Sequence, residues 1–156
     1  MFLVTAEDTS FGLKPINCPA HCVMFEHTLH SYRDLPLRYA DFGALHHHKT
    51  SPDTLCGLSE ACSFQQDSAH ILCRQDQIRT EALDLLDFME HVFKVVFGFT
   101  FSLQLTTRAR NTPGCSDNLW DEAEAALVNA LKIFGQPWTY CRSEGALCGP
   151  KIELKV

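Results

Sequence analysis

A change of hydrophobic period near the middle of the chain restricts the possible folds most strongly. Over residues 76–97 apolar residues recur every three or four positions, and Gly98 follows, which predicts an amphipathic helix that ends at a glycine. Apolar and polar residues then alternate from Phe99 to Leu105, which is typical of a strand with one buried face. The pattern therefore predicts a helix followed at once by a half-buried strand.

The residues before this helix predict a short helix and two strands. Pro19 suits an early position of a helix that begins near Asn17 or Cys18. The apolar runs at 35–45 and 63–73 flank a polar cluster, and they fit two antiparallel strands joined by a long loop.

The residues after residue 105 predict a second helix and two further strands. The helix is expected to begin at Ser116 or Asp117 and to end at Phe134, before Gly135. Short strands are expected over 138–141 and 151–156, and residues 108–115 are expected to form a loop. These elements favour one α+β domain, an antiparallel β-sheet flanked by helices, over a doubly wound parallel sheet.

Composition is consistent with a folded domain and excludes several classes. A chain of 156 residues with 46% hydrophobic and 21% charged residues can bury a core. The formal charge of −6 and the lack of a basic stripe on any predicted helix argue against strong attraction to a phosphate backbone. No apolar run is long enough to span a membrane. Glu7 and Asp8 come too early for a secretory signal peptide or an intact mitochondrial presequence.

Eight cysteines raise the question of disulfides. Because no secretory signal accompanies them, reduced thiols are expected, most of them small buried side chains.

Five separated segments resemble the threonyl-tRNA synthetases, a class II aminoacyl-tRNA synthetase family. The order and spacing of the segments match the family, and their wording is most similar to animal mitochondrial forms. The segments are LKPINCPAHC (13–22), SYRDLPLRYADFG (31–43), FQQDSAHI (64–71), QLTTR (104–108) and EGALCGPKI (144–152).

This resemblance implies an activity and a set of partners. The family uses ATP with Mg²⁺ to activate threonine and transfers it to the threonine tRNA. Residues 1–156 are expected to form a partial catalytic domain around motif 2, without motif 1, motif 3 or the anticodon-binding domain. The resemblance implies a protein of the mitochondrial matrix or of the cytoplasm. It implies no membrane partner.

The resemblance also assigns a metal site and polar contacts. Cys18 and His70 occupy two of the family's three zinc-ligand positions, and the third, a histidine, lies beyond Val156 in family sequences. Zinc is therefore expected to bind weakly or not at all. Without the resemblance, Cys18 is a thiol at a helix mouth and His70 a core histidine. Gln66 and Lys151 are retained catalytic positions, and Gln66 also belongs to the substrate-binding set.

Several other positions depart from the family's chemistry. His47 and Lys49 stand where motif 2 has an arginine for the α-phosphate and a glutamate for adenine, and Cys62 replaces a second arginine. In the substrate-binding set, Ser68 replaces an aspartate that pairs with the threonine ammonium, and Cys148 replaces a tyrosine. Loss of a cation that stabilises a transition state costs about 10²–10³ in rate. These changes predict an impaired or inactive segment.

The run of three histidines at 46–48 is expected to be a solvated loop edge rather than a metal site, because adjacent strand residues point to opposite faces.

Three interpretations remain open. The chain is an enzyme core that is completed by its missing segments, as a homodimer or with a full-length synthetase subunit. Alternatively, it is a non-catalytic, synthetase-like binding or dimerisation module. The third interpretation is a truncated product without a function of its own. Membership of the threonine–tRNA ligase family, with impaired catalysis by this segment alone, is the leading interpretation.

Overall fold

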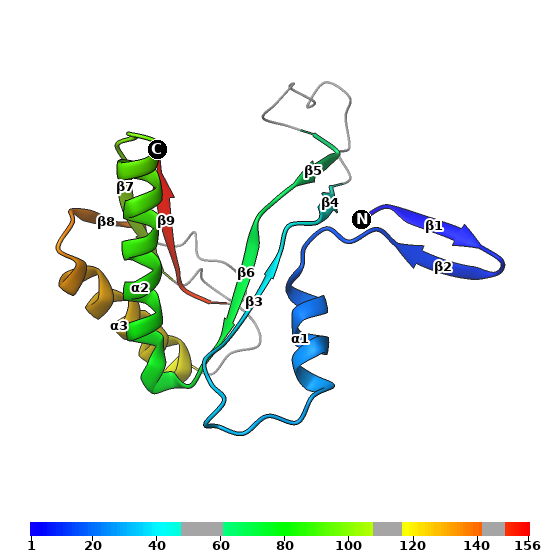
Figure 1. Ribbon diagram of the computed structural model, residues 1–156, viewed down its shortest axis with the longest axis horizontal. Helices are drawn as coiled ribbons and strands as arrows, with labels where there is room; N and C mark the ends of the chain where they lie inside the picture. Colours follow the sequence, from blue (N-terminus) through cyan, green and yellow to red (C-terminus); the bar gives the residue numbers. More distant parts are fainter. Residues whose placement is uncertain (48–60, 108–116, 142–148) are drawn as a thin grey trace. The chain divides into compact units, whose positions relative to one another are not determined.

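The computed structural model describes residues 1–47, 61–107, 117–141 and 149–156, except for the side chain of Asp117. The chain forms two compact units, Met1–Leu72 and Cys73–Val156 (Figure 1). The predictions made for His48, Lys49, Cys148 and the loop at 108–115 lie outside the described residues.

The first unit begins with a hairpin that the sequence analysis did not predict. Strands β1 (Leu3–Ala6) and β2 (Thr9–Gly12) pair antiparallel. The two turn residues, Glu7 and Asp8, both have positive φ, 48° and 64°. Glycine and asparagine are the usual residues in such a tight turn, so a Glu-Asp pair gives little signal in the sequence.

Helix α1 (Cys18–Glu26) confirms the predicted short helix, with Asn17 at its N-cap and Pro19 in its first turn. The side chain of Asn17 makes no capping hydrogen bond. It is buried, and its amide has no hydrogen-bond partner among the described residues. Of the nine residues of α1, all of them described, only His21 is buried. A helix this short depends on tertiary contacts, and His21 supplies the buried one.

Two antiparallel strand pairs confirm the predicted runs at 35–45 and 63–73. Each run is divided into two short strands. Strand β3 (Leu37–Asp41) pairs with β6 (Ser68–Leu72), and β4 (Ala44–His46) pairs with β5 (Ser63–Gln65).

The register of β3 and β6 places candidate site residues on one face. Tyr39 lies opposite His70, and Asp41 lies opposite Ser68. Residues two apart on a strand point to the same side, so these four side chains share a face. The ring of His21 contacts the rings of both Tyr39 and His70. This face is therefore the one that α1 covers.

The second unit begins with the long helical stretch predicted for 76–97. It comprises a 3₁₀ turn, η2 (Gln75–Gln77), helix α2 (Ile78–Glu90) and a π-helical segment, η3 (His91–Val96). Gly98 has a φ of 69° and ends the stretch as predicted, because glycine adopts this conformation without steric cost. The widened last part was not predicted, since a hydrophobic period does not distinguish α from π hydrogen bonding.

A three-stranded sheet completes the second unit. Helix α3 (Asp117–Phe134) and strands β8 (Trp138–Cys141) and β9 (Lys151–Lys155) match their predicted ranges closely. Strand β7 (Ser102–Thr106) begins three residues later than predicted. It pairs antiparallel with β9 and parallel with β8. The parallel pair follows from the crossover through α3. The other described pairs are antiparallel, and the α+β class is confirmed.

The described core of the second unit joins both helices to the sheet. Leu103 and Leu105 of β7 are buried against residues of α2 and α3. The buried members of this cluster are Leu86, Leu103, Leu105, Ala130 and Leu131. Among the described residues of the first unit, only Leu45 is a buried apolar residue. Polar contacts consequently have a larger part in positioning its elements.

Two further expectations can be compared with the structure. The five described cysteines are all free, as expected, but none of them is buried: Cys18 and Cys22 are exposed, and Cys62, Cys73 and Cys141 are partly buried. The expectation of small buried thiols is therefore wrong for these five.

No described helix has the length and apolar character needed to cross a lipid bilayer.

Replacement of Leu105 by alanine tests the core. Its side chain is 0% exposed, so Leu105→Ala is expected to lower the free energy of unfolding by about 2–5 kcal/mol. Leu119→Ala, at an exposed position of α3, should change it by less than about 0.5 kcal/mol. Urea unfolding followed by circular dichroism measures both. Equal effects would contradict this assignment of the core.

Replacement of Gly135 tests the end of α3. Gly135 has a φ of 77°, and its N–H donates to the carbonyl of Leu131 at 3.1 Å. A Cβ in this left-handed conformation costs about 1–2 kcal/mol, so Gly135→Ala should reduce stability by that amount. Gly149→Ala is the control, because φ there is not positive and a Cβ would meet no described atom within 4 Å. Thermal unfolding compares the two; similar melting temperatures would refute the conformational argument.

Candidate functional site

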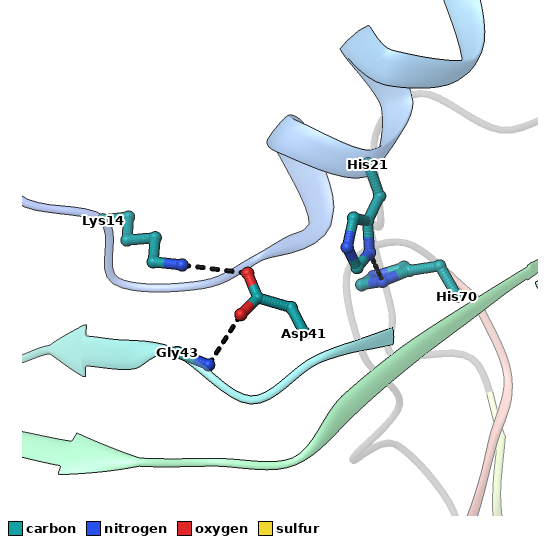
Figure 2. A network of polar contacts seen from close by, with 5 residues as sticks. All are labelled: Lys14, His21, Asp41, Gly43 and His70. Carbon is teal, nitrogen blue, oxygen red and sulfur yellow. Dashed lines mark hydrogen bonds and ion pairs between the residues drawn. The ribbon is translucent and has the colours of Figure 1, made fainter. Parts of the chain in front are cut away.

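Three polar side chains, Cys18, His70 and His21, contact one another in a row on the face of β3 and β6 beneath α1. The Nε2 atom of His70 lies 2.9 Å from the Sγ atom of Cys18. The Nδ1 atom of the same ring lies 2.6 Å from Nδ1 of His21, and Figure 2 shows His21 pointing from α1 toward His70. Both ring nitrogens of His70 therefore contact α1: Nε2 contacts Cys18 at the start of its first turn, and Nδ1 contacts His21 at the end of that turn.

The three side chains differ in burial. His21 is only 5% exposed, His70 is partly buried, and Cys18 is exposed. Burial, and after it the nearby His21 ring, lowers the pKa of His70. The neutral imidazole is consequently favoured, and a neutral imidazole is the form that binds metal ions.

A second contact holds the residues before α1 against the same strand. The ammonium group of Lys14 donates to Oδ2 of Asp41 at 2.9 Å, and the backbone N–H of Gly43 donates to Oδ1 at 2.6 Å (Figure 2). These two donors lower the pKa of the Asp41 carboxyl, the lysine contributing more. Asp41 is therefore an ionised group that faces the same side as Ser68 and His70.

The segment around Lys14 and Pro15 also lies beside the end of β4. The N–H of His46 donates to the carbonyl of Lys14 at 3.0 Å, and Nε2 of His47 donates to the carbonyl of Pro15 at 3.1 Å. The His47 ring lies edge-on to Phe64, with centroids 4.8 Å apart. The imidazole at the position of the family's arginine is thus held by a backbone carbonyl and an aromatic ring.

The other predicted site residues lie in several places. Ser68 is partly buried on the face that carries His70, and Gln66 is exposed in the connection between β5 and β6. Cys62 is partly buried, and its carbonyl accepts a hydrogen bond from His47 N–H at 2.9 Å. Lys151 belongs to the second unit, where its ammonium lies 2.6 Å from Oε1 of Glu153 and lowers the pKa of that carboxyl.

The geometry of Cys18 and His70 fits two ligands of a tetrahedral metal. Zn–S and Zn–N bonds of ordinary length at a tetrahedral angle separate the two donor atoms by about 3.6 Å. The observed 2.9 Å is a hydrogen-bond distance, and small side-chain movements would open it to that value. No group of three or more metal-binding side chains occurs among the described residues. The pair could therefore supply two ligands of such a site, and a complete site would require a third.

The sequence analysis did not identify three residues of this arrangement: His21, Asp41 and Lys14. A signal for His21 was present in its spacing, since residues three apart on a helix lie on one side and His21 is three residues after Cys18. No comparable signal pointed to Lys14 and Asp41, because their contact joins residues far apart in the sequence.

The chain is similar to a known family and to individual proteins within it. The family model of the tRNA synthetase class II core domain (G, H, P, S and T) matches residues 2–156. The cytoplasmic threonine–tRNA ligase of Caenorhabditis elegans is 49% identical over 100% of this chain, which covers 21% of that relative. The mitochondrial threonine–tRNA ligase 1 of Arabidopsis thaliana is 46% identical over 100% of this chain and 22% of its own length. The chain thus spans about a fifth of the length of these relatives, which include both cytoplasmic and mitochondrial proteins.

Solved structures agree with this comparison. A crystal structure described as the RNA binding domain of threonyl-tRNA synthetase from Cryptosporidium parvum matches with a TM-score of 0.91 and 45% identity, over 99% of this chain and 38% of that one. A putative threonyl-tRNA synthetase from Aeropyrum pernix matches with a TM-score of 0.87 and 26% identity, over 99% of this chain and 36% of that one. The chain therefore belongs to the tRNA synthetase class II core domain family and, within it, to the threonyl-tRNA synthetases.

Proposed function

We propose that this chain forms the threonine-binding part of the core of a threonine–tRNA ligase. The reaction of the whole protein is the ATP-dependent activation of threonine and its transfer to tRNA. The observation that carries the proposal is the contact of Cys18 Sγ with His70 Nε2 at 2.9 Å, on the sheet face beneath α1. A thiolate and an imidazole are the kinds of ligand that catalytic zinc sites use, and such sites hold the metal with three protein ligands.

In this proposal Cys18 and His70 hold a zinc ion together with a third ligand from outside the described residues. Bound zinc would chelate the amino and hydroxyl groups of threonine. Such a site rejects valine, since a polar ligand position discriminates strongly against a substrate without the hydroxyl, whereas an apolar pocket discriminates weakly.

The chain's own polar residues contribute binding and orientation. Gln66 is exposed in the connection between β5 and β6, and its side-chain amide offers both a donor and an acceptor to a polar substrate. The ammonium of Lys151 would stabilise negative charge on the phosphate of the adenylate. The hydroxyl of Ser68 can accept a hydrogen bond from the threonine ammonium but does not neutralise its charge. Substrate binding is consequently weaker than with an aspartate at this position.

The contacts of His47 favour a second candidate function, a non-catalytic binding or dimerisation module. The ring of His47 donates to the Pro15 carbonyl and packs on Phe64, so its donor Nε2–H is not free for a phosphate. An imidazole is also a weaker partner for phosphate than a guanidinium, which is always charged and binds phosphate through two parallel hydrogen bonds. Cys62 supplies no cation at the position of the second arginine. This segment alone is accordingly expected to be impaired or inactive.

The proposed partners follow from the family. They are threonine, ATP with Mg²⁺ and the threonine tRNA, and either a second copy of the chain or a full-length synthetase subunit. The description of the Cryptosporidium relative as an RNA binding domain supports the tRNA as a partner. The proposed compartment is the mitochondrial matrix or the cytoplasm, as in the two groups of relatives.

Metal binding is tested by titration of the chain with cobalt(II), which reports thiolate ligation by its absorption. Cys18→Ser should remove the thiolate band and weaken metal binding by more than about tenfold. Loss of a residue that only supports a metal ligand already weakens binding by about 10–100-fold, so loss of a ligand should cost at least the lower value. Cys22→Ser is the matched control, because Cys22 is an exposed cysteine one turn later on α1. A band that survives in Cys18→Ser and disappears in Cys22→Ser would contradict the assignment.

The departures from the family are tested by restoring them. The triple variant His47→Arg, Cys62→Arg, Ser68→Asp should bind a non-hydrolysable threonyl-adenylate analogue at least about tenfold more tightly, because a hydrogen bond to a charged group contributes about 1.5–3 kcal/mol. Isothermal titration calorimetry measures the affinity. His27→Arg adds an exposed cation at the end of α1 and should have no effect.

Equal affinities of the triple variant and the starting chain would show that these substitutions do not cause the impairment. Pyrophosphate exchange by the starting chain, dependent on ATP and threonine, would in turn exclude the non-catalytic module.

A further inference from the structure

The hydrogen bond between two histidines restricts where their protons can be. Nδ1 of His21 and Nδ1 of His70 are 2.6 Å apart. Two lone pairs, or two N–H groups, that face each other at this distance repel, so one proton lies between the two nitrogens. One neutral ring donates and the other accepts.

The direction of this bond decides what the other nitrogen of His70 can do. If His70 donates from Nδ1, its Nε2 carries a lone pair directed at Cys18, and this nitrogen can accept the thiol proton or bind a metal ion. If His21 donates, the proton of His70 is on Nε2 and points at the sulfur of Cys18. In that state His70 cannot ligate a metal through Nε2.

The surroundings of His21 fix the position of its ring. The side chain is 5% exposed. Its ring lies at 76° to the ring of His70, with centroids 4.7 Å apart, and contacts the ring of Tyr39, with centroids 5.7 Å apart. A buried ring held from two sides presents its Nδ1 atom at one place. Metal-binding histidines ordinarily donate their second ring N–H to such a fixed acceptor.

We infer that His21 is a positioning residue for the proposed metal site: its Nδ1 accepts the hydrogen bond from His70 Nδ1–H and so keeps the Nε2 lone pair of His70 directed at the metal position beside Cys18. The inference rests on the proposed function. It adds that the metal-free chain already holds His70 in the tautomer that the metal requires. Metal binding would then require only that the Cys18 thiol release its proton to solvent, with no change of tautomer in His70.

A purely structural role is the competing explanation, since His21 is the buried residue of α1. Two variants separate the roles. His21→Phe keeps an aromatic ring in the buried position but removes the acceptor. His21→Asn keeps a polar δ atom, which can accept the same bond, but loses much of the ring. A structural role predicts that His21→Asn is the more harmful of the two, whereas the positioning role predicts that His21→Phe is.

The first readout is the tautomer of His70, obtained from long-range ¹H–¹⁵N NMR spectra of the metal-free 156-residue chain. His70 is expected as the Nδ1–H tautomer in the starting chain and in His21→Asn. In His21→Phe it is expected to change to the Nε2–H tautomer, because Nδ1–H then has no acceptor and Nε2–H can donate to Cys18. An Nε2–H tautomer in the unmutated chain overturns the inference, whether or not either variant folds.

The second readout is the affinity for cobalt(II). His21→Phe should weaken binding by about 10–100-fold, the usual effect of losing the partner of a metal-binding histidine, and His21→Asn should bind nearly as well as the starting chain. His27→Phe, which replaces the exposed histidine at the C-cap of α1, is the control and should change neither readout. Unchanged affinity in a folded His21→Phe variant overturns the inference. If the starting chain binds no cobalt, which is the expected result when the third ligand is missing, the tautomer measurement alone decides the role of His21.

Discussion

The antiparallel register of β3 and β6 is the constraint on which the candidate site depends. It places Tyr39 opposite His70 and Asp41 opposite Ser68, and the alternation of a strand then directs these side chains to one face. A shift of one residue would turn every one of them to the other side of the strand pair. The side chains of Cys18, His21 and Lys14 make contacts with this face. The register therefore determines whether Cys18 and His70 can meet.

The first unit positions its elements by polar contacts more than by an apolar core. Leu45 is its one buried apolar residue among those described, whereas His21 anchors α1 and the Lys14–Asp41 pair anchors the residues before it. Hydrogen bonds and ion pairs depend on direction and distance, unlike apolar burial. An arrangement of this kind fixes the orientation of a few side chains, which is what a binding site needs.

The proposed metal ligands and the positions that the resemblance assigns to phosphate binding differ in how their side chains are arranged in this chain. The thiol and the imidazole that we propose as metal ligands are in contact, and His70 has a buried partner on its other nitrogen. At the positions that the resemblance assigns to phosphate binding, His47 is held by Pro15 and Phe64, and Cys62 stands in place of an arginine. The described residues thus hold the proposed ligand pair in contact but place no cation at the positions of His47 and Cys62.

The sequence by itself determined the family and most of the elements, because their signals are local: helical and alternating periods, the glycines at 98 and 135, and the five motif segments. It missed the β1–β2 hairpin, whose Glu-Asp turn lacks the usual residues, and the parallel pairing of β7 with β8, which depends on where α3 returns the chain. Only the tertiary structure decided which polar groups meet. The contacts of His21 with His70, of Lys14 with Asp41 and of His47 with Pro15 join residues far apart in the sequence, and a local pattern carries no information about such distances.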